Sequence, residues 1–67
     1  MKIDNQLDGT FAIRASREDL LILNNALNEI CNGLSVPDFE TRVGAPLASA
    51  ERLLEIVGAA LDRYAAH

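Results

Sequence analysis

The sequence has few nucleophilic and metal-binding side chains of the cysteine and histidine kind: one cysteine (Cys31) and one histidine (His67) among 67 residues. A single cysteine excludes an internal disulfide and is typical of a reducing compartment, so we expect a cytoplasmic protein. Cys31 belongs to an apolar stripe and His67 is the last residue, so we expect no catalytic Cys–His pair. Metal-ligand spacing is also absent, and we predict neither enzymatic activity nor a cofactor.

Basic residues and long apolar runs are scarce as well. Six lysines and arginines stand against ten aspartates and glutamates, a net charge of −4. This charge disfavours nucleic acid and anionic membrane surfaces, and it favours a basic protein as the partner. No apolar run approaches the roughly 20 residues of a membrane span. Residues 1–4 alternate between polar and apolar, so we expect no signal peptide.

Hydrophobic residues make up 49% of the chain, which is enough for one folded domain spanning residues 1–67. Domains of this size bury only about 60% of their unfolded surface and are marginally stable alone. With no disulfide to add stability, the composition favours a partner subunit.

Residues 2–15 carry a hairpin signal, with two short strands around Asp8-Gly9. A three-residue loop, Leu7-Asp8-Gly9, with Gly9 in a left-handed bulge position places apolar side chains opposite one another. An isolated hairpin is marginal in water, so we expect its apolar face to pack on helices. That face would consist of Ile3, Phe11 and Ile13.

Three helices should follow, which gives an α+β fold with the hairpin packed on one long, one short and one long helix. Ser16 is a suitable N-cap for a helix over 17–32, which a left-handed glycine after Asn32 would end. Pro37 suits the first turn of a short helix over 37–43 that stops at Gly44. Pro46 suits the start of a third helix over 46–65.

The apolar spacing of the two long helices defines the predicted core. On the first helix the stripe is Leu20, Leu23, Leu27, Ile30, Cys31 and Leu34, and on the third it is Leu47, Ala50, Leu53, Leu54, Val57, Leu61 and Tyr64. Gly58 lies on the same inner face. Because glycine weakens a helix by about 1 kcal/mol relative to alanine, we expect another backbone to approach it closely.

Asparagine fills four of the nine positions from Asn24 to Asn32, although it is a poor helix former. One interpretation is structural: Asn24 and Asn28 satisfy backbone groups at the hairpin edge or in the loop 35–38, and Asn32 is a C-cap. The other is functional, with an exposed amide-rich, acidic patch that binds a partner. This patch would consist of Glu18, Asn25, Asn28, Glu29 and Asn32.

Three apolar residues, Leu21, Ile22 and Ile56, fall off the predicted stripes. Exposed apolar area of this kind favours a homodimer interface. The alternative is that the hairpin packs across Leu21 or Ile22.

Residues 39–55, FETRVGAPLASAERLLE, have the outline of a helix-turn-helix. Glu40 occupies a position that usually needs a small residue, and only Arg52 could read a base edge, so DNA binding is disfavoured. Arg42 could pair with Asp38 or Glu51, or it could bind an acidic group of a partner.

The segments LNNALNEICNG and FETRVG resemble a pattern in small bacterial proteins, some of them similar to immunity proteins of polymorphic-toxin or contact-dependent inhibition systems. The resemblance covers residues 20–55 and implies a small acidic protein that binds and blocks a toxin. It points to Asn24, Asn25, Asn28, Glu29, Asn32, Gly33, Phe39, Glu40, Arg42 and Gly44. We therefore predict a non-catalytic, immunity-like inhibitor, with a helix-turn-helix regulator and a homodimeric assembly module as alternatives.

Overall fold

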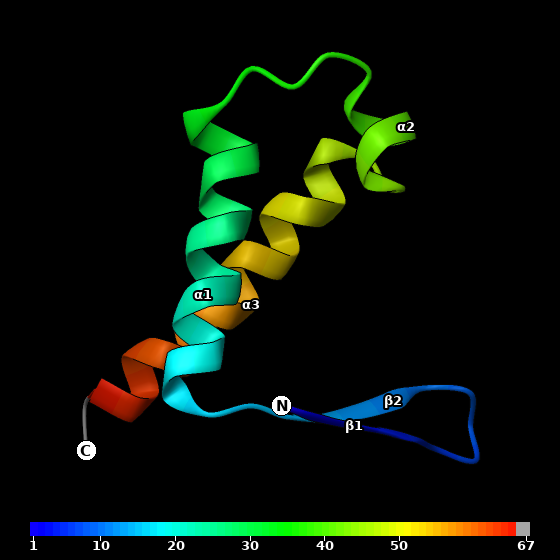
Figure 1. Cartoon of the computed structure of the whole chain (residues 1–67), viewed down its shortest axis with the longest axis vertical. Helices are drawn as coiled ribbons and strands as arrows, with labels where there is room; N and C mark the ends of the chain where they lie inside the picture. The colour runs from blue at the N-terminus through cyan, green and yellow to red at the C-terminus, as the bar shows by residue number, and fades with distance from the viewer. Residues whose placement is uncertain (66–67) are drawn as a thin grey trace.

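The computed structural model describes residues 1–65, and the placement of side chains up to residue 63; the predictions for Tyr64 and His67 lie outside this part. A two-stranded hairpin precedes the helices, so the α+β class is confirmed (Figure 1). The elements, in chain order, are β1 (Lys2–Asn5), β2 (Phe11–Arg14), α1 (Arg17–Asn28), the π-helical turn η1 (Glu29–Gly33), α2 (Phe39–Val43) and α3 (Leu47–Ala65).

The hairpin has the predicted register and turn. β1 and β2 are antiparallel, and Ile3 lies opposite Ile13. The Gln6 amide donates to the Thr10 carbonyl at 2.8 Å, and Gly9 adopts a left-handed φ of 87°. The three-residue loop Leu7-Asp8-Gly9 is therefore confirmed, with glycine at the position where a Cβ is unfavourable.

The expected packing of this hairpin on the helices is wrong. Figure 1 shows the two strands extending away from the helical part of the molecule. The apolar face stays largely in solvent: Ile3, Phe11 and Ile13 are all more than half exposed, with Phe11 at 63%. The local chemistry of the turn sets the register of the hairpin, and this does not require that one face packs on helices. The sequence pattern therefore predicted the strands but not whether they contact the helices.

Helix α1 begins as predicted and ends differently. The Asp19 amide donates to the Ser16 hydroxyl at 3.1 Å, and the Ser16 amide donates to the Asp19 carboxylate at 3.3 Å, which is a complete capping box. At the other end Gly33 has no positive φ, so the predicted left-handed glycine stop is wrong. The helix widens into η1 instead, where the Leu34 amide donates to the Glu29 carbonyl at 2.8 Å.

Helix α2 is shorter than predicted because its start moves from residue 37 to Phe39. Asp38 precedes it with φ 52° and ψ 46°, a left-handed conformation that is costly for a residue with a Cβ, and its side chain makes no cap hydrogen bond. Pro37 consequently lies in the turn before the helix rather than in its first turn. The predicted stop at Gly44 is confirmed by its φ of 88°.

The core lies where α1 crosses α3, and it is thin. Only Ala50 and Leu61, both on α3, are buried among the described side chains. Beside the crossing, a Cβ built on Gly58 would lie 3.6 Å from the Asn24 side-chain oxygen, an ordinary contact. The expected close approach of another backbone to Gly58 is therefore wrong, because a side chain of α1 fills that space.

Candidate functional site

The outer face of α1 carries a row of exposed side chains. At 100° per residue, Glu18, Asn25 and Glu29 lie within about 20° of the direction opposite the half-buried Leu27. Ile22 lies between them along the helix and is 62% exposed. We call these four residues, Glu18, Ile22, Asn25 and Glu29, the outer row. They combine carboxylates, an amide and one large apolar group that folding leaves in solvent.

The remaining asparagines have different surroundings. Asn32 donates from its side-chain nitrogen to the Asn28 side-chain oxygen at 2.9 Å, and both residues are exposed on the flank beside the outer row. Asn24 is half-buried and lies against Gly58 at the helix crossing. Neither Asn24 nor Asn28 bonds a backbone group of the hairpin edge or of the loop 35–38 within the described chain, so that structural interpretation is wrong.

Glu40 and Arg42 are exposed on α2 and are not joined to the outer row. Figure 1 shows that the loop after η1 carries the chain across to α2, well away from the middle of α1. In the part of the chain that the structure describes, Arg42 forms no ion pair with Asp38 or Glu51, contrary to the pairing suggested by sequence. Glu40 and Arg42 are therefore a separate surface.

The first helix of the helix-turn-helix outline over 39–55 is unusually short. α2 contains five residues, and it does not pack extensively on α1 or α3. A recognition helix is normally held in place by such packing. The geometry thus gives no support to a DNA-reading role for Arg52, which is exposed on α3.

The three predicted interface residues are not equivalent. Leu21 is half-buried, whereas Ile22 and Ile56 are 62% and 59% exposed, on α1 and α3 respectively. The hairpin does not cover Ile22, so the alternative in which it packs across that side chain is wrong. Ile22 belongs to the outer row. Ile56 belongs neither to that row nor to the lining of a second apolar surface, which sequence reasoning missed.

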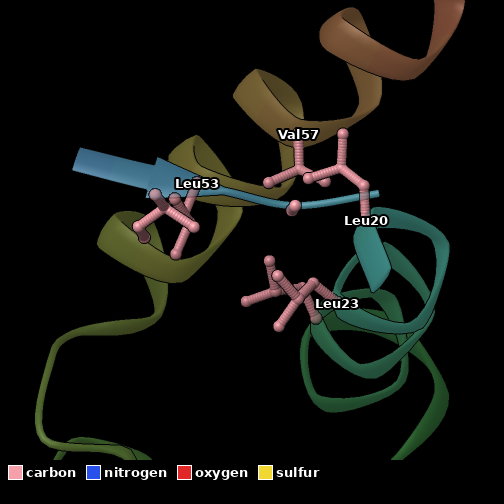
Figure 2. Close-up of a pocket in the computed structure, with 7 residues that line it drawn as sticks. Leu20, Leu23, Leu53 and Val57 are labelled. Carbon is pink, nitrogen blue, oxygen red and sulfur yellow. The ribbon is translucent and has the colours of Figure 1, made fainter. Parts of the chain in front are cut away.

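This second surface is an open trough between α1, α3 and the link from β2 to α1 (Figure 2). Figure 2 shows Leu20 and Leu23 directed towards Leu53 and Val57 across the gap. Its volume is about 360 Å³, and its lining residues are Ile13, Ala15, Leu20, Leu23, Leu27, Leu53 and Val57. The predicted stripes contain most of these residues, but periodicity cannot show that α1 and α3 diverge and leave them uncovered.

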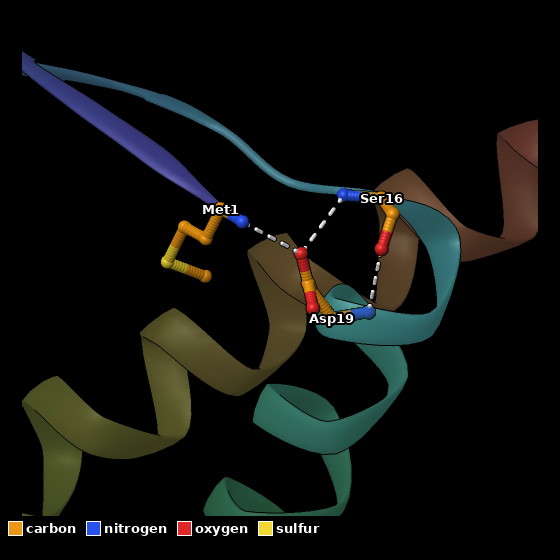
Figure 3. A network of polar contacts seen from close by, with 3 residues as sticks. All are labelled: Met1, Ser16 and Asp19. Atoms are coloured by element: carbon orange, nitrogen blue, oxygen red, sulfur yellow. Dashed lines mark hydrogen bonds and ion pairs between the residues drawn. The ribbon is translucent and has the colours of Figure 1, made fainter.

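Two carboxylates have perturbed titration, and both stabilise local structure. The ammonium group of Met1, 3.2 Å from the Asp19 carboxylate, and the Ser16 amide lower the pKa of Asp19 (Figure 3). Hydrogen bonds from the hydroxyl and amide of Thr10, at 2.6 and 3.0 Å, lower the pKa of Asp8. The lowered pKa favours the charged form of both carboxylates. Asp8 lies in the hairpin loop and Asp19 in the first turn of α1, and neither lines the trough.

Among the described residues, no group of three histidine, cysteine or acidic side chains is placed to hold a metal ion. None of the described helices is long and apolar enough to cross a membrane. The Cys31 thiol is free and half-buried.

Comparisons with family models, with curated proteins and with solved structures find no match to this chain.

Proposed function

We propose that the protein is a non-catalytic protein-binding module, an immunity-like inhibitor that blocks a basic partner through the outer row of α1. The observation that carries this proposal is Ile22, which is 62% exposed between Glu18, Asn25 and Glu29. Protein interfaces commonly have an apolar centre surrounded by polar groups that exclude water and fix the orientation. The outer row has this composition along α1 and the first residue of η1.

The charge of the chain supports a basic partner. A net charge of −4 accelerates encounter with a positive surface, and the two carboxylates of the outer row, Glu18 and Glu29, would meet that surface directly. The neighbouring amides of Asn28 and Asn32 offer further donors and acceptors on the flank. Inhibition by covering a partner's active surface needs no catalytic group in the inhibitor.

The first experiment is an affinity capture from the native host, run with and without nuclease treatment and followed by quantitative mass spectrometry. We expect one stoichiometric basic protein, retained less as ionic strength rises. The double variant Asn25→Ala/Glu29→Ala should weaken its binding at least about tenfold with the fold intact, because both side chains are exposed. The control is Glu51→Ala/Glu55→Ala, which removes two exposed carboxylates of α3. It removes two negative charges, whereas the outer-row variant removes one, so a loss of overall charge would weaken binding more in the control.

A second arm tests inhibition itself. The retained protein is expressed alone and together with this chain, and growth is measured. Growth restored by the wild type and not by the outer-row variant supports the proposal. Equal binding by the outer-row and control variants removes the outer row as the site, and recovery of nucleic acid bound through Arg52 would favour the regulator instead.

A further inference from the structure

The molecule exposes more surface than a compact protein of its mass. Its accessible surface is 5413 Å², whereas folded monomers of 7.3 kDa expose about 4,200 Å². Its radius of gyration is 13.3 Å, against about 11 Å for a compact domain of this length. About 1,200 Å² per chain is therefore surface that a compact fold would have covered.

The exposed hairpin face and the trough form one continuous apolar surface. Ile13 lines the trough and also belongs to the exposed hairpin face, so the two regions meet at that residue. Phe11 shares the face of Ile13, because alternate residues of a strand point the same way, and Ile3 lies opposite Ile13. On the far wall of the trough, Leu53 is 49% exposed. A projecting arm and an apolar trough thus lie side by side on each chain.

We propose that a second copy of this chain covers the trough, with the hairpin face of each copy seated against the trough of the other. A two-fold axis makes the exchange reciprocal. The hairpin of each copy then covers the trough of the other, so both hairpin faces and both troughs are covered in one dimer. The surface is self-complementary because each chain supplies one projecting and one receding apolar part. The proposed dimer surface comprises Ile3, Phe11 and Ile13 of the hairpin with Leu23, Leu53 and Val57 of the trough.

The size of the excess accessible surface favours a second copy of the chain over a small ligand. If association covered the whole excess of about 1,200 Å² on each of two chains, it would bury about 2,400 Å² in total, which is within the range of obligate homodimers. A small ligand filling 360 Å³ would leave the hairpin face in solvent. Homodimer interfaces are also more apolar than transient ones, and all seven residues that line the trough are apolar.

Charge does not oppose this pairing, although both copies are acidic. Glu51 and Glu55 lie about 160° around α3 from Leu53. On the hairpin, Asp4 is one residue from Ile3 and therefore on the opposite face. The carboxylates of the outer row are on the far side of α1 from Leu27. The dimer surface is distinct from the outer row, so the two proposals can fail separately.

The test measures the mass of the untagged chain by sedimentation equilibrium and native mass spectrometry over a dilution series. We expect twice 7.3 kDa with no retained small molecule. Phe11→Asp should raise the dimer dissociation constant about thirtyfold or more, the effect of losing an interface hot spot. Ile22→Asp is the matched control, because Ile22 is equally exposed, at 62% against 63%, and lies outside the dimer surface.

Because Phe11→Asp could also prevent folding of an obligate dimer, a second measurement uses the wild type alone. Labelled and unlabelled chains are mixed, and isotope-filtered NOEs between Phe11 of one copy and Leu53 or Val57 of the other are expected. A folded wild-type monomer, whether empty, bound to an apolar small molecule or bound only to a different protein, overturns the proposal. So does a dimer whose intermolecular NOEs come from Ile22 or Ile56 instead.

Discussion

At the scale of single residues, the start of α1 depends on a few short polar contacts. The Asp19 carboxylate accepts from the Ser16 amide and pairs with the Met1 ammonium group at 3.2 Å, while the Ser16 hydroxyl accepts from the Asp19 amide. These contacts tie Met1, the residue before β1, to the first turn of the helix. Figure 3 shows them as a single connected network. The helix start therefore also anchors the base of the hairpin.

This network predicts a pH dependence of stability. The pKa of Asp19 is lowered below 3.8 in the folded chain, mainly by the Met1 ammonium group. A group whose pKa is depressed by folding contributes stability that is fully present above its unfolded pKa and lost as the pH falls through the folded value. We expect the thermal midpoint to decrease below about pH 4 and to do so less steeply in Asp19→Asn. Equal slopes in the two proteins, with Glu18→Gln as the control for charge, would contradict the assignment.

At the scale of elements, the helix crossing predicts a stabilising substitution. Gly58 lies inside α3, and a Cβ there would contact the Asn24 side-chain oxygen at 3.6 Å without a clash. Because alanine is favoured over glycine in a helix, Gly58→Ala should raise the free energy of unfolding by about 0.5–1 kcal/mol. Urea titration measures the change. Ala59→Gly, at an exposed position one residue along, should lower it by a similar amount; a loss of stability in Gly58→Ala would mean that the helices approach more closely than described.

The sequence predicted most of the local structure of the elements but not how the elements contact one another. Signals that act within a few residues were sufficient: the three-residue hairpin loop, the Ser16 cap and the Gly44 stop all depend on local backbone chemistry. Two local signals failed, because Gly33 has no positive φ and Pro37 lies before α2. The other failures concern contacts between elements. Periodicity identified the inner stripes of α1 and α3, but it could not show that the hairpin turns away and leaves the trough open. Part of the candidate site was predicted, since the exposure of Asn25 and Glu29 follows from their spacing, whereas the separation of Glu40 and Arg42 depends on the loop path.

At the scale of the whole molecule, the thin core and the large accessible surface both indicate that one chain buries little apolar area. Ordering a residue costs on the order of 1–2 kcal/mol of backbone entropy, which apolar burial has to offset. Two buried side chains, Ala50 and Leu61, provide little of that burial within one chain. If a second copy provides the rest, folding and association are a single equilibrium, and stability must depend on protein concentration.

The expected signature is a thermal midpoint that rises by about 5 °C for each tenfold increase in protein concentration, given the unfolding entropy of two chains of this length. Calorimetry or circular dichroism over a hundredfold range measures it, with reversibility checked by rescanning. Ile22→Asp should keep the slope, because that side chain lies on the outer row. Phe11→Asp should lower the midpoint at every concentration. A reversible midpoint that does not move with concentration would mean that one chain folds alone, and that the trough and the hairpin face stay exposed in the native molecule.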